Sequence, residues 1–169
     1  MERILIIGGN GSGKTTFSRA LAEVLHLPLI HLDTLYWRDN WTPAPNEEFD
    51  ALLLEELRKP RWIIDGNISR TLPMRLPYCD TVIYFDFSRL ACLRGVLTRS
   101  IRYRGQSRSD MGGYCPESVN WSFLRLVWHF NDRLRDRYYS LLGEASHAHV
   151  IILKNRRQAR AFLRSLNPR

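Results

Sequence analysis

A short segment near the start of the chain has the residue types and spacing of a phosphate-binding loop. It reads Gly8-Gly-Asn-Gly-Ser-Gly-Lys-Thr15 and fits the pattern G-x-x-x-x-G-K-[ST]. Its glycines let backbone N–H groups approach phosphate oxygens without a Cβ in the way. Lys14 is the residue that reaches the β- and γ-phosphates in such loops, and the Thr15 hydroxyl binds Mg²⁺. The predicted nucleotide contacts are Gly8, Gly9, Asn10, Gly11, Ser12, Gly13, Lys14, Thr15 and Thr16.

Three aspartates directly follow short apolar runs. Asp65 comes after Trp62-Ile-Ile64, an arrangement that holds Mg²⁺ in phosphate-loop proteins, and we assign it to the metal with a cap or turn carboxylate as the alternative. Asp33 is in a position to orient or deprotonate an acceptor hydroxyl, although a turn or N-cap role explains it equally well. Asp86 precedes an expected helix, and capping explains it best.

Three arginines are candidates for contacts with the γ-phosphate. Phosphoryl transfer gains most from positioned positive charge, which Arg99, Arg133 and Arg137 can supply. Arg133 and Arg137 are spaced i, i+4 and share one flank of an expected helix. The alternative is a solvated charged flank that Asp132 and Asp136 partly neutralise.

Aromatic residues gather just after the second apolar run. Tyr36 and Trp37, with Trp41 close behind, are placed to stack on a ring of the acceptor. Such a cluster is more often local core, and both interpretations stay open.

Five short apolar runs alternate with stretches whose apolar residues have helical spacing. Runs that are apolar on both faces and alternate with helices indicate a parallel sheet covered on both sides. We therefore predict an α/β fold in which residues 1–169 form a single domain. The expected strands are 4–7, 29–32, 61–64, 81–85 and 150–153, and the expected helices are 15–25, 46–59, 89–103, 121–142 and 156–166.

Composition limits the possible classes of protein. The 169 residues include 44% hydrophobic and 25% charged residues, which is typical of a globular domain. No apolar run approaches the roughly 18 residues that cross a membrane. Cys79, Cys92 and Cys115 are too few and too widely spaced for a four-cysteine zinc site or a disulfide framework, so we expect a cytoplasmic protein. The formal charge of +8 predicts an anionic partner, and residues 89–137 carry +6 of it.

Taken in order, the motifs resemble the adenylate-kinase-like P-loop kinases, and more closely the family of DNA topology modulation proteins. The resemblance implies a three-layer α/β/α fold with a five-stranded parallel sheet, an acceptor-binding insert at about 34–60 and a mobile lid at about 102–117. It supports Asp65 at the metal, suggests Asn67 and Arg70 near the acceptor, and places Arg99 at the lid hinge. It rests on Gly8 to Thr15, His31 to Trp37 with Trp41, Trp62 to Asn67, Tyr84 to Phe87, Tyr103 to Gly105, Arg108 to Met111 and Cys115 to Glu117.

Two positions depart from the adenylate kinase pattern. A second hinge arginine would fall at Gly95, where only the neighbouring Arg94 is basic. Adenylate kinases also place an arginine for the AMP phosphate three residues after the aspartate, whereas here Asp33 is followed by Thr-Leu-Tyr36. The second departure argues against AMP as the acceptor.

The sequence thus predicts ATP- and Mg²⁺-dependent phosphoryl transfer to a nucleotide, a nucleoside or another small molecule. One alternative is a nucleic-acid-binding protein that uses the loop as a nucleotide-controlled switch. Another is an antibiotic or metabolite kinase with an alcohol acceptor, for which Asp33 would be the essential base. No recognised nucleic-acid-binding motif is present, so we favour a kinase.

Overall fold

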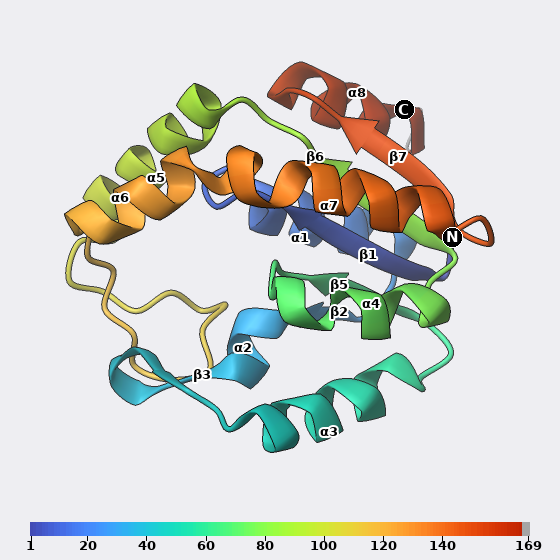
Figure 1. The fold of residues 1–169 in the computed structure, drawn as a ribbon, viewed down its shortest axis with the longest axis horizontal. Coiled ribbons are helices and arrows are strands. Elements are labelled where there is room, and N and C mark those ends of the chain that lie inside the picture. Colours follow the sequence, from blue (N-terminus) through green and yellow to red (C-terminus); the bar gives the residue numbers. More distant parts are fainter. Residues whose placement is uncertain (167–169) are drawn as a thin grey trace.

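The five apolar runs form one parallel sheet in the computed structural model, which describes residues 1–166 (Figure 1). The strands lie in the order β2-β5-β1-β6-β7, and every neighbouring pair is parallel. Their bounds are β1 Arg3–Gly8, β2 Leu29–His31, β5 Trp62–Asp65, β6 Thr81–Phe85 and β7 His149–Leu153. Because parallel strands end at the same edge, the phosphate loop and the strand-end carboxylates emerge together there.

Helices cover both faces of this sheet, which confirms the predicted three-layer fold (Figure 1). On β1, Leu5 and Ile7 pack in one buried cluster, and Ile4 and Ile6 pack in the other. The first cluster includes residues of α3 (Asn46–Leu57), α4 (Leu72–Arg75) and α7 (Phe130–Glu144). The second includes residues of α1 (Lys14–Leu25), α5 (Arg89–Arg102), α6 (Trp121–Trp128) and α8 (Arg156–Leu166).

The single helix expected at 121–142 is wrong, because the chain breaks at His129. The side chain of Asn120 caps α6 by accepting from the Phe123 N–H at 2.8 Å. His129 leaves the helical conformation, with φ −92° and ψ 6°, and α7 begins at Phe130. The break lets α6 run along α5 while α7 turns to cover the sheet (Figure 1).

The chain between β2 and β5 forms a small lobe of its own. The helix α2 (Leu32–Tyr36) follows β2 directly and shortens that strand by one residue relative to the prediction. A two-stranded hairpin of β3 (Trp37–Arg38) and β4 (Thr42–Pro43) comes next, joined by a 3₁₀ turn at Asp39–Trp41. The helix α3 then returns the chain to the sheet.

The segment between α5 and α6 lies against this hairpin. The Tyr114 N–H donates to Asp39 Oδ1 at 2.6 Å, and the Trp41 indole N–H donates to the Pro116 carbonyl at 3.1 Å. A Cβ on Gly112 would lie 2.2 Å from the Thr34 carbonyl oxygen, so the two backbones touch there. The loop that the sequence predicts as a lid is thus docked on the hairpin in this structure.

No helix within residues 1–166 is both long enough and apolar enough to cross a membrane.

Two adjacent leucines on α3 test how much the packing of this helix against the sheet contributes to stability. Leu53 is fully buried against the sheet, whereas Leu52 is 37% exposed. Leu53→Ala should lower the free energy of unfolding by about 2 to 5 kcal/mol, because it opens a cavity in a packed cluster. Leu52→Ala should lower it by less than about 1 kcal/mol. Urea denaturation of both variants measures the difference, and equal losses would contradict the packing described here.

Candidate active site

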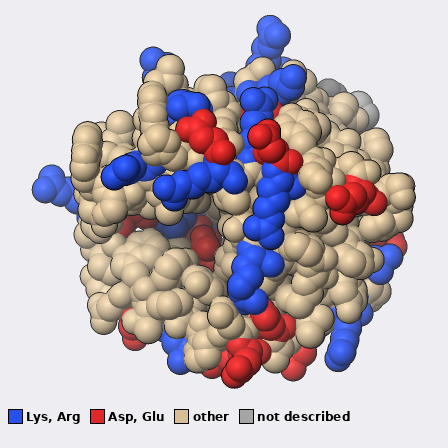
Figure 2. Space-filling model, viewed as in Figure 1, with Lys and Arg blue, Asp and Glu red and all other residues tan. Residues whose placement is uncertain are grey.

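A cavity of about 1120 Å³ opens at the carboxyl edge of the sheet. Figure 2 shows it as a hollow on this face, with acidic and basic atoms visible inside. The phosphate loop, the α2 region, the end of β5, α5, the lid segment and α7 all contribute to its wall. Of the residues predicted from sequence, the wall includes Asn10, Gly11, Gly13, Lys14, Thr15, Thr16, Asp33, Tyr36, Trp37, Asp65, Asn67, Arg70, Arg99 and Arg133.

The phosphate loop is held in shape by its own polar groups. Gly13 precedes α1 in the left-handed region (φ 94°, ψ 19°), where a side chain would strain the backbone. The Ser12 hydroxyl and the Lys14 ammonium both donate to the Gly9 carbonyl, at 2.8 and 2.9 Å. Burial lowers the pKa of Lys14, and the negative charges of Asp65 and Asp33 partly oppose that shift. The loop therefore presents a desolvated positive charge at the cavity floor.

The loop also rests directly on α5. A Cβ added to Gly95 would lie 1.8 Å from the Gly11 carbonyl oxygen, which no side chain can tolerate. A Cβ on Gly11 would in turn lie 2.2 Å from the Cys92 carbonyl oxygen. This contact explains why position 95 cannot carry the hinge arginine expected from the adenylate kinase pattern.

Asp65 ends β5 beside the phosphate loop and is buried. Its Oδ2 accepts from the Ser18 hydroxyl and faces His31 Nδ1, both at 3.2 Å. Its Oδ1 is buried and has no hydrogen-bond partner among the described residues. Thr15 lines the same cavity, and a hydroxyl together with an orphaned carboxylate oxygen suits a hard cation such as Mg²⁺. No group of three His, Cys, Asp or Glu within residues 1–166 could enclose a metal ion, so such an ion would also need oxygens from a nucleotide or water.

Asp33, on α2, lines the cavity without a hydrogen-bond partner for its carboxylate among the described residues. Burial and the neighbouring charge of Asp65 raise the pKa of Asp33, while Arg108 and Lys14 act in the opposite direction. A carboxylate with free acceptor positions and a raised pKa is suited to take a proton.

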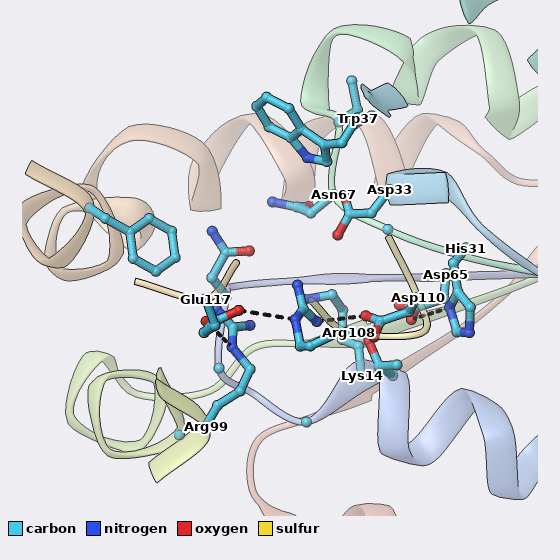
Figure 3. Close-up of a pocket in the computed structure, with 18 of the residues that line it drawn as sticks. Lys14, His31, Asp33, Trp37, Asp65, Asn67, Arg99, Arg108, Asp110 and Glu117 are labelled. Atoms are coloured by element: carbon cyan, nitrogen blue, oxygen red, sulfur yellow. Dashed lines mark hydrogen bonds and ion pairs between the residues drawn. The ribbon is translucent and has the colours of Figure 1, made fainter. Parts of the chain in front are cut away.

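Two arginines approach the centre of the cavity from different elements. Arg99 lies in the last turn of α5, and Arg108 lies in the lid segment. Figure 3 shows Arg108 between Glu117 and Asp110, with both carboxylates in ion pairs with it. In the sequence, residues 108–111 and 115–117 support only the resemblance and predict no site role for Arg108, Asp110 or Glu117. The bridge from Glu117 to Arg99 joins residues 18 positions apart, so it leaves no local spacing signal.

The loop after β5 carries Asn67 and Arg70. The Tyr138 hydroxyl donates to Asn67 Oδ1 at 2.7 Å, and burial raises the pKa of Tyr138 to about 12, so this donor keeps its proton. Arg70 makes a two-pronged pair with Asp50, at 2.9 and 2.7 Å. Both residues line the cavity, and Arg70 is already neutralised.

The remaining predicted arginines differ in position. Arg133 lines the cavity with an exposed side chain, whereas Arg137, also exposed, is not part of the wall.

Asp86 is paired with an arginine of α7, since Arg135 donates to Asp86 at 2.8 Å. The sequence prediction that Asp86 caps a helix is wrong, because Ser88 accepts from the Ala91 N–H and caps α5 instead.

The aromatic cluster is both core and cavity wall. Tyr36 packs edge-on against Phe49 of the buried cluster, with ring centroids 5.2 Å apart. Trp37 lies between Tyr36 and Trp41, at 4.9 and 5.5 Å. Figure 3 shows Trp37 on the same side of the cavity as Asp33, so an acceptor beside Asp33 would meet this ring.

Comparisons with known proteins agree with this geometry, although no family model matches the chain. A cytidylate kinase from Pyrobaculum aerophilum is 27% identical over 158 residues, covering 85% of this chain and 76% of that protein. The shikimate kinase from Acinetobacter baumannii, solved with shikimate, has a TM-score of 0.60 and 19% identity over 98% of this chain and 90% of its own. A gluconokinase from Sinorhizobium meliloti has a TM-score of 0.56 and 17% identity over 99% of this chain and 94% of its own.

The sheet and the phosphate loop form the P-loop α/β fold seen in the shikimate kinase structures, and the sequence similarity is to cytidylate kinases. These similarities support a P-loop kinase enzyme.

Two glycines in helices test the contact between α5 and the phosphate loop. Gly95→Ala should push α5 away from Gly11 and weaken nucleotide binding by roughly tenfold or more, because the phosphate loop loses its packing contact with α5. Gly143→Ala on α7 is the matched control, since nothing lies within 4 Å of its Cβ position. Titration calorimetry with ATP measures both. Equal affinities for the two variants would show that the contact does not shape the loop.

Proposed function

We propose that this kinase transfers the γ-phosphoryl group of ATP to a hydroxyl group of a small molecule, with Asp33 as the general base. The observation that carries the proposal is the Asp33 carboxylate, which faces the cavity without a partner and has a raised pKa. A hydroxyl acceptor needs such a base, whereas a phosphate acceptor is already ionised and needs positive charge instead.

In the proposed reaction the acceptor oxygen attacks the γ-phosphorus while Asp33 takes its proton. A bond forms between the acceptor oxygen and phosphorus, the bond to the β-phosphate oxygen breaks, and ADP leaves. Lys14 and the N-terminus of α1 would hold the β- and γ-phosphates. Arg99, Arg108 and Arg133 would balance the charge on the transferring group.

A bound Mg²⁺ would neutralise phosphate charge, and Asp65 with Thr15 would hold it. The orphaned Asp65 Oδ1 supports this assignment. The role predicted for Arg137 is not part of the proposal, since that side chain does not line the cavity.

A nucleoside monophosphate acceptor is the second candidate, and the cytidylate kinase relative favours it. Arg70 would then contact the acceptor phosphate and would have to leave its pair with Asp50. Tyr36 and Trp37 would face a base in this case and another ring or a sugar in the first.

The finer resemblance to DNA topology modulation proteins and the cytoplasmic location stay predictions. Much of the positive charge of residues 89–137 has a phosphate-binding explanation, since Arg99, Arg102, Arg108 and Arg133 line the cavity. For this reason we place a nucleic-acid-binding function below both kinase candidates. Duplex DNA binding that survives about 0.15 M salt and responds to nucleotide would reverse that order.

Lys14→Ala and Asp65→Ala test the nucleotide site. Each should lower ADP formation roughly 100-fold or more, because a positioned charge on the phosphates or the metal is lost. Glu56→Gln, which removes only a surface pair with Lys59, should leave the rate unchanged. A coupled ADP assay over a panel of nucleosides, nucleoside monophosphates and sugar or amino alcohols supplies the measurement and identifies the acceptor. Full activity of purified Lys14→Ala would rule out the site.

Asp33→Asn and Arg70→Ala separate the two acceptor classes. With a hydroxyl acceptor, Asp33→Asn should lower kcat by roughly 100-fold to 10,000-fold, and Arg70→Ala should have a small effect. A larger loss of kcat/KM in Arg70→Ala than in Asp33→Asn would favour the phosphate acceptor instead.

The pH profile gives a second check on Asp33. A base acts in its ionised form, and burial raises the pKa of Asp33, so kcat should fall on acidification at a pH above the ordinary aspartate range. The remaining activity of Asp33→Asn should lack this acidic limb. A wild-type rate that stays flat down to the ordinary aspartate pKa would contradict the assignment.

A further inference from the structure

Two buried carboxylates occupy a cavity built for anions. Asp110 and Glu117 have side chains that are 6% and 2% exposed, and both come from the lid segment. Carboxylates beside a triphosphate would repel it unless each were bound to a cation. The cationic side chains that pair with Asp110 and Glu117 therefore indicate the role of these two carboxylates.

Glu117 binds two arginines at once. Its Oε1 accepts from Arg99 Nε at 2.7 Å, and its Oε2 accepts from Arg108 Nε at 3.1 Å (Figure 3). Because one carboxylate bridges two elements, the positions of the two guanidinium groups are set relative to each other. The Nη groups of Arg99 have no hydrogen-bond partner among the described residues and remain available to a ligand.

Asp110 fixes the other side of Arg108. Its Oδ2 accepts from Arg108 Nη1 at 2.6 Å, and Arg108 Nη2 lies 3.1 Å from Met111 Sδ. Arg108 is thus held on three sides, with a side chain only 11% exposed. Its orientation is set before any ligand binds, which lowers the entropy cost of a contact made there.

The bridge lines the same cavity as the phosphate loop and the proposed base Asp33. Burial lowers the pKa of Arg99, with the charge of Arg108 acting in the same direction and Glu117 opposing it. Arg99 in turn lowers the pKa of Lys14, and Arg108 lowers that of Asp33. The charges of the two arginines therefore act on both Lys14 and Asp33.

We propose that Glu117 is a positioning residue that holds Arg99 and Arg108 on the γ-phosphate, and so makes the site prefer ATP to ADP. The inference rests on the proposed function, since it needs ATP in the phosphate loop. Glu117 acts through the two arginines and touches no substrate itself. The β-phosphate contacts of Lys14 and the loop do not depend on it.

A purely structural role for Glu117 predicts a different outcome. Its backbone already ties the ends of the lid together, since its N–H donates to the Gln106 carbonyl at 2.9 Å and its carbonyl accepts from the Gly105 N–H at 3.3 Å. Glu117→Gln keeps this backbone and the side-chain size, but it removes the negative charge and replaces one acceptor oxygen with an NH2 donor, so it can no longer accept from both arginines. Glu56→Gln is the matched control, because Glu56 is paired with Lys59 and neither residue lines the cavity.

The test compares the dissociation constants of Mg·ATP and Mg·ADP by titration calorimetry. In Glu117→Gln we expect the preference for ATP over ADP to fall about tenfold or more, the scale of one charge-assisted hydrogen bond. The ADP affinity should stay close to that of the wild type, whereas the melting temperature should fall, because two largely buried guanidinium groups lose a counter-charge. Asp110→Asn weakens the pair with Arg108 and a longer pair with Arg19 at 3.6 Å, and leaves the Glu117 bridge in place. It should give a smaller fall in the preference for ATP, and it replaces Glu117→Gln in the test if that variant does not fold.

A double-mutant cycle shows whether Glu117 acts through the arginines. If it does, Glu117→Gln should cost little further preference for ATP once Arg99 and Arg108 are both alanine. An undiminished loss in that background would overturn the inference.

The other outcomes are also decisive. A Glu117→Gln protein that keeps the wild-type preference overturns the inference and leaves the kinase intact. The same holds if the ATP and ADP affinities fall by the same factor, or if the wild type binds ATP and ADP equally. If the folded wild-type protein binds neither ATP nor ADP, the proposed function itself fails, and the inference fails with it.

Discussion

The structure of the cavity depends on charge compensation in a place with little water. Lys14, Arg108, Asp65 and Glu117 are all nearly buried, and a buried ion is costly unless an opposite charge or a hydrogen bond meets it. Most of these charged groups are paired with other groups of the protein. Three polar groups in the cavity wall lack a partner among the described residues: one Asp65 oxygen, the Asp33 carboxylate and the Nη groups of Arg99. These unpaired groups define the kind of ligand that fits.

The sheet and the phosphate loop could be predicted from sequence because their signals are local. The run before Gly8 is apolar on both faces, and the loop pattern is eight residues long. The helix break at His129 could not be predicted, since both sides of it have helical spacing and the break depends on packing against α5. Asp86 was misassigned for a similar reason, because its partner Arg135 lies on a helix distant in sequence.

In the site, too, residues with local motifs could be predicted from sequence and residues that act through long-range contacts could not. Lys14, Asp33, Asp65 and Arg99 were identified from motifs and do line one cavity. Glu117 gave no sequence signal of its own, because its role depends on its ion pairs with Arg99 and Arg108, which form only when the chain folds. Residues that bind substrate are thus easier to find from sequence than the residues that hold them in place.

The contact between Gly11 and Gly95 restricts how this chain can evolve. Gly95 lacks a side chain because the Gly11 backbone occupies the space, and Gly11 lacks one because the backbone of Cys92 and Val96 on α5 does, so neither can change without a compensating shift of α5. A glycine in the middle of a helix normally weakens it, and here that weakness accompanies a close approach to the phosphate loop. Relatives that carry an arginine at the position of Gly95 must therefore seat this helix farther from the loop, and their nucleotide pockets should differ in width.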